Sequence, residues 1–532
     1  MSAYPIVFRD GTLLDGSGAA ARAADVAVEG ESIAAIGEGL RGRREIDCSH
    51  LVIAPGFIDT HSHSDLRVLT EPLLPMKLRQ GITLEVLGQD GISVAPVRPH
   101  HIPETCQALS GLLGDLPEEQ WRWERVRDYL KVLEQCRPAL HLAYLVPHGT
   151  LRAYVMGREN RRPTPAELQR MRAELARGLD EGALGLSTGL IYPPCCYSDT
   201  DELVALGQVL APRKAPLVAH MRSESDLIER AIDEMMEVGL RSRCPVHISH
   251  FKVAGRENFS RAASLVERIE EARRLGVSVT GDQYCYAAGS TLLGAILPPW
   301  AHAGGPTKTL ERLRDPATRQ KMREDIEKKG VLAWDSFWKW TGPEGIVISG
   351  IASGRHPEWL GKSVAEGAKA AGREPLDFAF ELLESESMGV SMISRSQSEE
   401  VVERFMSLPY LNGCTDALLG DRPHPRAYGT FPRFLGHYVR EKKLLGLSEM
   451  IRKLTSQAAH AMNLADLGEV RPGFAADLVV FDPTSIKDTA TYAEPVSYPE
   501  GVIHVMVRGE MAVENSEITG VRAGRVVRRE SE

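Results

Sequence analysis

The sequence has few cysteines for its length and no apolar run of membrane-spanning length. Eight cysteines in 532 residues are too few for a disulfide framework, and the adjacent pair Cys195-Cys196 does not have zinc-ribbon spacing. No uninterrupted apolar stretch reaches the roughly 20 residues that a membrane-crossing helix needs. The first residues also lack the charged and apolar segments of a secretory signal. We therefore predict a cytoplasmic protein.

A strong charge of either sign is also absent. The chain has 63 basic and 72 acidic residues, a net charge of −9. Nucleic acids and anionic membranes are bound by clustered Lys and Arg, whereas the basic run from Arg522 to Arg529 is short and interrupted. We therefore predict no nucleic-acid partner and no membrane partner. No sequence feature indicates the oligomeric state.

The two ends of the chain differ in pattern from its middle. In the first fifty residues, short apolar runs are separated by the turn signals Asp10-Gly11 and Glu29-Gly30. The last seventy residues repeat this pattern, so we predict that residues 1–54 and 468–532 form one small β-sandwich domain. Residues 55–467 alternate short β runs with helical segments, which indicates βα units and a parallel sheet.

The alternating middle contains eight candidate strands, which predicts an α/β fold of the (β/α)₈ TIM-like barrel type. The gap before the last strand is far longer than the others and predicts an inserted subdomain at about 286–350. One helix is predicted to begin at Pro165, because Thr164 and Glu167 form a capping box around it. The eight strands are Gly56–Thr60, Thr83–Leu87, Leu142–Val146, Ala183–Leu186, Leu217–Ala219, Val246–Ser249, Val277–Gly281 and Leu411–Thr415.

Imidazole and carboxylate side chains follow five of these strands at their carboxyl ends, the face on which barrel enzymes place their active sites. Such side chains suit a divalent metal such as zinc. The His-x-His pair after the first strand directs both rings to the same side, because side chains alternate along extended chain. We interpret His247, inside the sixth strand, as a core residue. The predicted ligands are His61, His63, Asp90, His220, His250 and Asp416.

Several motifs resemble those of a known family. The run Ala54-Pro55-Gly56-Phe57-Ile58-Asp59-Thr60-His61-Ser62-His63 resembles the opening signature of the amidohydrolase superfamily. Residues 185–194, 248–252, 282–290 and 424–433 are similar to segments of the D-aminoacylases (N-acyl-D-amino-acid deacylases). The likeness covers essentially the whole chain. It implies metal-dependent hydrolysis of the amide bond of a small N-acyl-D-amino acid, and the D-stereochemistry follows from the resemblance alone.

One motif departs from the D-aminoacylase pattern. D-aminoacylases usually have Asn-Cys-Gly after strand two, where the thiolate binds zinc, but this chain has Gln89-Asp90-Gly91. A carboxylate can bridge two metals, and as a harder ligand than thiolate it also admits manganese or cobalt. We expect zinc first, as one or two ions. By this interpretation His220, His250 and Asp90 hold one metal, and His61, His63 and Asp416 hold a second.

The chemistry of amide hydrolysis assigns roles to further residues. A bound metal activates water and polarises the carbonyl, and Asp416 is the candidate general base and acid. Tyr192 or Lys252 is expected to help stabilise the oxyanion. The substrate carboxylate calls for a cation, for which Arg426 has the planar fork, with Lys252 and Tyr284 as further candidates. His148 and Arg152 follow the third strand but receive no role.

Three other interpretations compete. A cyclic amidase of the hydantoinase or dihydroorotase type typically uses a carboxylated lysine after strand four, and the run Gly185-Leu186-Ser187-Thr188-Gly189 has no lysine. A dipeptidase stays open, whereas a non-catalytic scaffold is disfavoured because every ligand position is kept.

The predicted insertion has two possible roles. It is either a lid with aromatic surface or a subdomain that buries its own tryptophans. Its tryptophans are Trp300, Trp334, Trp338 and Trp340.

Overall fold

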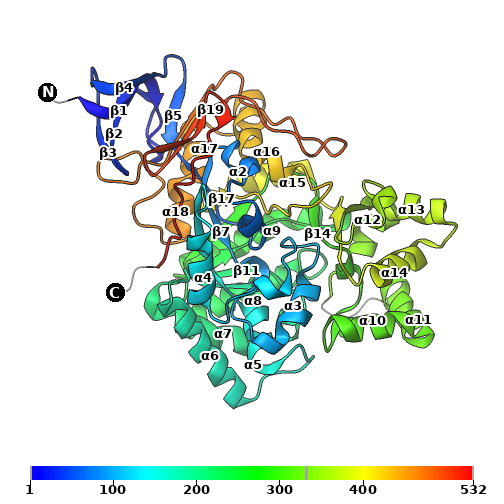
Figure 1. Cartoon of the computed structure of the whole chain (residues 1–532). Helices are drawn as coiled ribbons and strands as arrows, with labels where there is room; N and C mark the ends of the chain where they lie inside the picture. The colour runs from blue at the N-terminus through cyan, green and yellow to red at the C-terminus, as the bar shows by residue number, and fades with distance from the viewer. Residues whose placement is uncertain (1–2, 330–333, 530–532) are drawn as a thin grey trace.

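Strands from both ends of the chain pair in one sheet (Figure 1). The computed structural model describes residues 3–329 and 334–529, and in these ranges the sheet has nine strands. Strand β5 pairs antiparallel with β18 and thereby joins the two ends. The strands are β1 (Tyr4–Leu13), β2 (Arg22–Glu29), β3 (Ser32–Gly37), β4 (Gly42–Asp47), β5 (Val52–Pro55), β18 (Leu478–Phe481), β19 (Val502–Val507), β20 (Glu510–Glu514) and β21 (Glu517–Ile518).

Parallel strands form the central barrel. One ladder runs β6-β7-β8 and another β9-β10-β11-β12-β13-β17, and a parallel bridge between Ser62 and Ala417 brings the first strand against the last. The predicted (β/α)₈ barrel with an additional β region is confirmed. The barrel strands are β6 (Phe57–Asp59), β7 (Ile82–Leu87), β8 (His141–Tyr144), β9 (Val146–Pro147), β10 (Leu186–Gly189), β11 (Leu217–His220), β12 (Val246–Ile248), β13 (Val279–Gln283) and β17 (Leu411–Gly413).

The largest displacement of a predicted strand is at β10, which begins at Leu186, where the prediction ended. The apolar run Ala183-Leu184 is buried but precedes the ladder. Because apolar character reports burial, it does not distinguish the approach to a barrel strand from the strand itself.

Helices cover the outside of the barrel. In α6 the predicted capping box is confirmed: Glu167 N donates to Thr164 Oγ1 at 3.3 Å, and Thr164 N donates to Glu167 Oε2 at 2.8 Å. Within residues 3–329 and 334–529, no helix has the length and apolar character needed to cross a membrane. The barrel helices are α1 (Arg67–Thr70), α2 (Pro75–Leu78), α3 (Ile102–Leu109), α4 (Val126–Gln135), α5 (His148–Met156), α6 (Pro165–Asp180), α7 (Thr200–Leu210), α8 (Ile228–Ser242), α9 (Ala262–Arg274), α15 (Glu399–Met406), α16 (Arg426–Arg433), α17 (Leu447–Leu454) and α18 (Ser456–Ala461).

The segment between β13 and β17 contains a small antiparallel sheet of its own, at one side of the barrel in Figure 1. Its strand order is β14-β16-β15, so the central strand β16 extends this unit to Ser394, past residue 350. Its tryptophans are partly buried against its own apolar core. The elements are β14 (Gly289–Leu292), α10 (Pro306–Arg314), α11 (Pro316–Glu324), α12 (Phe337–Gly345), β15 (Ile346–Ile351), α13 (Val364–Ala371), α14 (Pro375–Ser385) and β16 (Val390–Ser394).

Candidate active site

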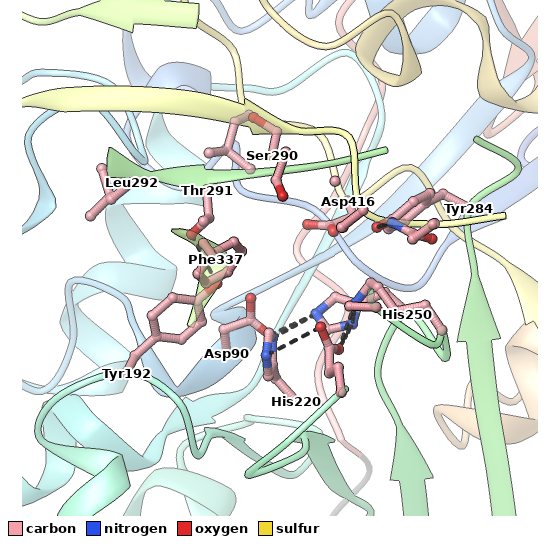
Figure 2. Close-up of a pocket in the computed structure, with 18 of the residues that line it drawn as sticks. Asp90, Tyr192, His220, His250, Tyr284, Ser290, Thr291, Leu292, Phe337 and Asp416 are labelled. Carbon is pink, nitrogen blue, oxygen red and sulfur yellow. Dashed lines mark hydrogen bonds and ion pairs between the residues drawn. The ribbon is translucent and has the colours of Figure 1, made fainter. Parts of the chain in front are cut away.

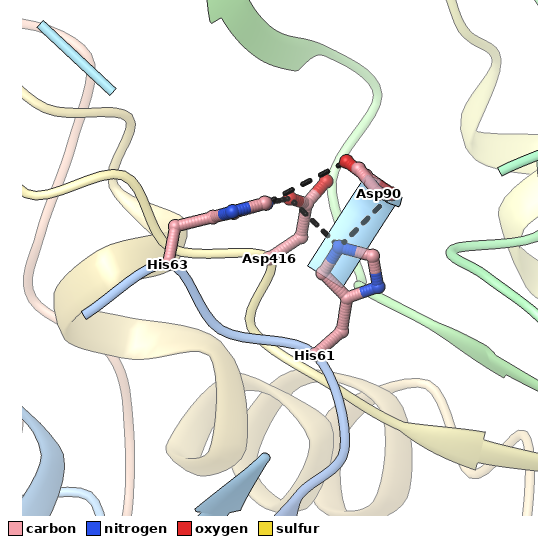
Figure 3. Close-up of side chains that lie close together, drawn as sticks. All are labelled: His61, His63, Asp90 and Asp416. Carbon is pink, nitrogen blue, oxygen red and sulfur yellow. Dashed lines mark ion pairs between the residues drawn. The ribbon is translucent and has the colours of Figure 1, made fainter. Parts of the chain in front are cut away.

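The structure brings all six predicted metal ligands together at the carboxyl ends of the barrel strands. They form two groups, and within each group the potential ligand atoms lie within 4.8 Å of one another. Figure 3 shows the first group, and Figure 2 shows Asp90, His220 and His250 of the second. All six side chains are buried. The first group is His61, His63, Asp90 and Asp416, and the second is Asp90, His220 and His250.

Asp90 belongs to both groups and directs both carboxylate oxygens to histidines. Its Oδ1 lies 3.5 Å from His61 Nε2, 3.5 Å from His250 Nε2 and 3.8 Å from His220 Nδ1. Its Oδ2 lies 3.6 Å from His63 Nε2. Two ligands on one tetrahedral metal with bonds of about 2.1 Å are about 3.4 Å apart. The spacing therefore fits side chains that share bound cations.

Two of these atoms have no hydrogen-bond partner in the described part of the chain. His61 Nε2 and Asp90 Oδ1 are buried and unpaired. Leaving such atoms unpaired costs about 1–3 kcal/mol each, and a divalent cation would remove that cost for the atoms that face the cluster. Burial by itself raises the pKa of Asp90. The nearby His61 and His250 have a larger, opposite effect, so the pKa lies well below its usual range. The carboxylate is therefore ionised and able to bind a metal.

The backbone at the site is strained. Asp90, His250 and Asp416 have φ angles of 56°, 36° and 50°, in the left-handed region that L-residues rarely adopt. Such conformations cost about 1–3 kcal/mol each and cluster at functional sites. Three of the six candidate ligands are therefore held in conformations that the surrounding structure must enforce.

Asp416 faces both the cluster and a buried cation. Its Oδ1 lies 3.3 Å from His63 Nε2, and its Oδ2 lies 2.8 Å from Arg426 Nη1. Burial raises the pKa of Asp416, but Arg426, followed by His63 and His61, holds it far below its usual range. Asp416 is therefore ionised at neutral pH, as a general base must be.

Arg426 is fully buried. Besides Asp416 it contacts the carbonyl of Ser290, to which Nη2 donates at 3.1 Å, and its guanidinium lies 4.6 Å from the centre of the Tyr284 ring. A pocket lies beside the cluster of candidate metal ligands, and Arg426 is not among the side chains that line it. The predicted contact of Arg426 with a substrate carboxylate therefore stays a prediction, and its observed partner is Asp416.

Comparison with known proteins assigns the chain to a family. A model of the amidohydrolase family matches residues 44–295 and 412–513, two segments that lie on either side of most of the insertion. The D-aminoacylase of Alcaligenes xylosoxydans xylosoxydans is 34% identical, over 99% of this chain and 98% of that one. The chain belongs to the amidohydrolase family, in its D-aminoacylase branch.

Two further relatives support the branch. The N-acyl-D-glutamate deacylase of Alcaligenes xylosoxydans xylosoxydans is 35% identical, over 99% of this chain and 97% of that one. The crystal structure of the N-acyl-D-glutamate deacylase of Bordetella bronchiseptica superposes with a TM-score of 0.84 at 32% identity, over 99% and 100% of the two chains. That enzyme is complexed with zinc and a phosphonate that mimics the tetrahedral intermediate. Over nearly all of its described length, this amidohydrolase therefore shares the fold of its branch.

Glu224 is a buried carboxylate of this amidohydrolase that sequence reasoning missed. Its Oε1 lies 3.2 Å from His250 Nδ1, and its Oε2 lies 3.7 Å from His220 Nε2. These are the outward nitrogens, whereas His250 Nε2 and His220 Nδ1 lie 2.9 Å apart and face Asp90. A carboxylate behind a ligand imidazole fixes its tautomer and orientation. Its position four residues after His220, in the same loop, could have indicated this role.

Replacing Glu224 by glutamine is expected to weaken zinc binding by about 10- to 100-fold, as loss of such a supporting carboxylate does. The affinity can be measured by competition with a chromophoric chelator. Glu237→Gln, on the exposed face of α8, is the matched control and should bind zinc like the parent. Unchanged affinity in Glu224→Gln would show that this carboxylate does not support the ligands.

A buried ionic network below the cluster ties the first barrel strand to the last. Lys77 Nζ lies 2.7 Å from Asp59 Oδ2 and 3.2 Å from Glu85 Oε2. Asp59 Oδ1 also accepts a hydrogen bond from Thr415 N at 2.8 Å. Asp59 precedes His61 by two residues, and Thr415 precedes Asp416. The network therefore helps to position two candidate ligands, His61 after the first barrel strand and Asp416 after the last.

The predicted substrate residues Tyr192, Lys252 and Tyr284 line the pocket beside the cluster, and Figure 2 shows the two tyrosines. Tyr192 Oη is 2.9 Å from Thr291 Oγ1, and Lys252 Nζ donates to Glu224 Oε1 at 2.5 Å. Tyr284 Oη accepts from Gln397 Nε2 at 2.6 Å. The insertion also lines the pocket, through Ser290, Thr291, Phe337 and Trp340. It therefore contributes directly to the site.

Two further histidines have other partners. His247 Nε2 lies 3.0 Å from Asp282 Oδ2, and its Nδ1 lies 2.8 Å from Thr280 Oγ1. His148 Nε2 lies 2.8 Å from Glu202 Oε1, and Arg152 pairs with the other oxygen of that carboxylate. These histidines are thus satisfied outside the cluster, as was predicted for His247.

Proposed function

We propose that this amidohydrolase hydrolyses the amide bond of N-acyl-D-amino acids and releases a carboxylate and a free D-amino acid. The observation that carries the proposal is the cluster of six buried side chains of metal-ligand type, five of which line a pocket with polar groups for a carboxylate. Named D-aminoacylases and deacylases align with the chain over nearly its full length, and the preference for D-substrates is taken from them.

The residues fit a divalent metal. His220, His250 and Asp90 would hold one ion, and His61, His63, Asp90 and Asp416 have the donors for a second. We propose zinc, by analogy with the zinc-containing relative; the hard carboxylate of Asp90 also admits manganese or cobalt. When bound, such a metal lowers the pKa of water and polarises the substrate carbonyl.

The side chains of the protein carry the proton transfers. Asp416 takes a proton from the attacking water as the new C–O bond forms, and passes it to the nitrogen as the C–N bond breaks. Arg426 keeps Asp416 ionised before this step. Lys252 and Tyr284, which line the pocket, would bind the substrate carboxylate. Tyr192 lies beside the candidate ligand His220, with 5.1 Å between the ring centres, and would help to stabilise the oxyanion.

The test is the release of free amino acid from paired N-acetyl-D- and N-acetyl-L-amino acids. The enzyme is stripped of metal and reloaded separately with zinc, manganese and cobalt. We expect metal-dependent release confined to the D-series and none from the stripped enzyme. Release from cyclic amides or dipeptides alone, or from no substrate with any metal, would contradict the proposal.

A further inference from the structure

The insertion contacts the loop that carries Glu224 through one buried carboxylate. Asp335 lies in the insertion, just before α12, and is buried. Its Oδ2 accepts a hydrogen bond from Glu224 N at 2.6 Å. Its Oδ1 accepts from Ser223 Oγ and from Ser225 Oγ, each at 2.7 Å. One carboxylate of the insertion therefore holds three consecutive residues of a barrel loop, all of them buried.

The loop depends on this carboxylate because it has no regular structure of its own. Residues 221–227, all of which the structure describes, connect β11 to α8 without a helix or strand. Ser223 Oγ accepts hydrogen bonds from Ser225 N and Leu227 N, both at 3.2 Å, so this hydroxyl closes the turn. A hydroxyl has a single proton, and that of Ser223 is donated to Asp335. Asp335 therefore orients the group around which the turn forms.

The backbone of Glu224 is held from two sides. Its N–H donates to the insertion, and its carbonyl oxygen accepts from Ala254 N, in the barrel loop after β12, at 2.7 Å. Its carboxylate lies behind the candidate ligands His220 and His250. Outer partners orient a ligand through hydrogen bonds of defined direction, and that direction changes if the backbone of Glu224 moves.

A second contact joins the same part of the insertion to the same loop, but it is exposed. Lys339 Nζ lies 2.6 Å from Asp226 Oδ2, and the two side chains are 55% and 45% exposed. Exposed ion pairs contribute little to stability, because water and salt screen them. The buried contact of Asp335 is therefore the one expected to fix the loop.

We propose that Asp335 is a positioning residue of the metal centre: it holds the backbone of Glu224, and Glu224 in turn orients His220 and His250. The insertion thereby supports the metal as well as lining the pocket. Asp335 is not among the side chains that line the pocket, so it acts through Glu224 and not on the substrate. This inference rests on the metal site of the proposed function.

The first test is a double-mutant cycle on zinc affinity, measured by competition with a chromophoric chelator. Asp335→Ala is expected to weaken zinc binding about tenfold, the lower end of the range for outer partners of a metal site. In the Glu224→Gln background the same substitution should cost less than about twofold, because residues that act through one contact are not additive. A full tenfold loss in that background would show that Asp335 acts independently of Glu224 and would overturn the proposal.

Two further variants separate this role from a general effect on the fold. In Asp335→Asn the amide oxygen can accept from Glu224 N while the amide nitrogen donates to the serine hydroxyls, so most of the zinc affinity should return. Lys339→Met removes the exposed contact to the same loop and should bind zinc like the parent. A loss in either variant equal to that in Asp335→Ala would overturn the assignment to these buried hydrogen bonds.

Hydrogen exchange of the parent protein tests the proposal without any variant that must fold. Coupling between two sites is reciprocal, so removing the metal must loosen the residues around Asp335. Peptides that span residues 334–341 should exchange faster in the metal-free protein, whereas α13, elsewhere in the insertion, should be unchanged. Equal exchange of residues 334–341 with and without metal would overturn the proposal.

These measurements distinguish failure of this inference from failure of the proposed function. A parent protein that binds neither zinc, manganese nor cobalt would contradict the metal site itself. A parent that binds zinc, together with an Asp335→Ala variant of the same zinc affinity, would overturn only the role of Asp335.

Discussion

Replacing Asp90 by alanine is expected to empty both metal groups and to reduce kcat/KM by about three orders of magnitude or more, because metal activation supplies several kcal/mol. Asp90 is the one residue that belongs to both groups found in the described part of the chain. Metal content by plasma emission spectrometry and kcat/KM for an acetyl-D-amino acid test this. Full metal occupancy and parental activity in the variant would contradict the placement.

Two companion substitutions separate metal binding from folding. Asp90→Asn suits the left-handed backbone at this position, where φ is 56°, because Asn and Asp tolerate it best. It should therefore fold like the parent and still lose metal. Asp90→Cys replaces the carboxylate by a thiolate and should recover activity with zinc more than with manganese. An unchanged manganese-to-zinc activity ratio would show that Asp90 does not contact the working metal.

Asp416→Asn is expected to lower kcat by about 10²- to 10⁴-fold, the usual contribution of a general base. The metal held by His220, His250 and Asp90 should remain, so metal content separates loss of the base from loss of the ion. Asp421→Asn, on an exposed aspartate of the same loop, is the matched control. Near-parental kcat in Asp416→Asn would remove this residue from the mechanism.

Stability must be measured with the same variants, because Asp416 also balances the buried charge of Arg426. Breaking such a buried pair by removing one partner costs about 3–5 kcal/mol of unfolding free energy. Asp416→Glu keeps the charge but moves the carboxylate by one methylene. It should fold more stably than Asp416→Asn and remain slow, which would separate a misplaced base from an unstable protein.

The barrel and the six candidate ligands could be predicted from the sequence because both follow from local patterns. Strand and helix periodicities alternate along the middle of the chain, and parallel strands place their carboxyl ends on one face. Ligand-type side chains directly after those strands must therefore meet. The chemistry of His and Asp in such a cluster then favours a metal, and the motif around His61 and His63 indicates the family.

Only the tertiary structure revealed the partners of these residues. Glu224 contacts the backs of two histidines, Arg426 pairs with Asp416, and Lys77 joins Asp59 to Glu85. Each contact depends on side-chain directions and on segments that are distant in the chain, and a one-dimensional pattern contains neither. The sequence therefore identified Arg426 as a cation at the site but not the carboxylate it faces.

The insertion could also be predicted only in part from the sequence. Its existence follows from the long gap before the last barrel strand, but its extent does not, because β16 joins the small sheet by pairing between strands that are far away in sequence. The pocket beside the cluster is likewise assembled from segments that are far apart in the chain. The sequence by itself determined the barrel, the ligand types and the family, because these depend on local residue order. The paired charges, the extent of the insertion and the pocket were decided by the tertiary structure, because they depend on which distant surfaces pack together.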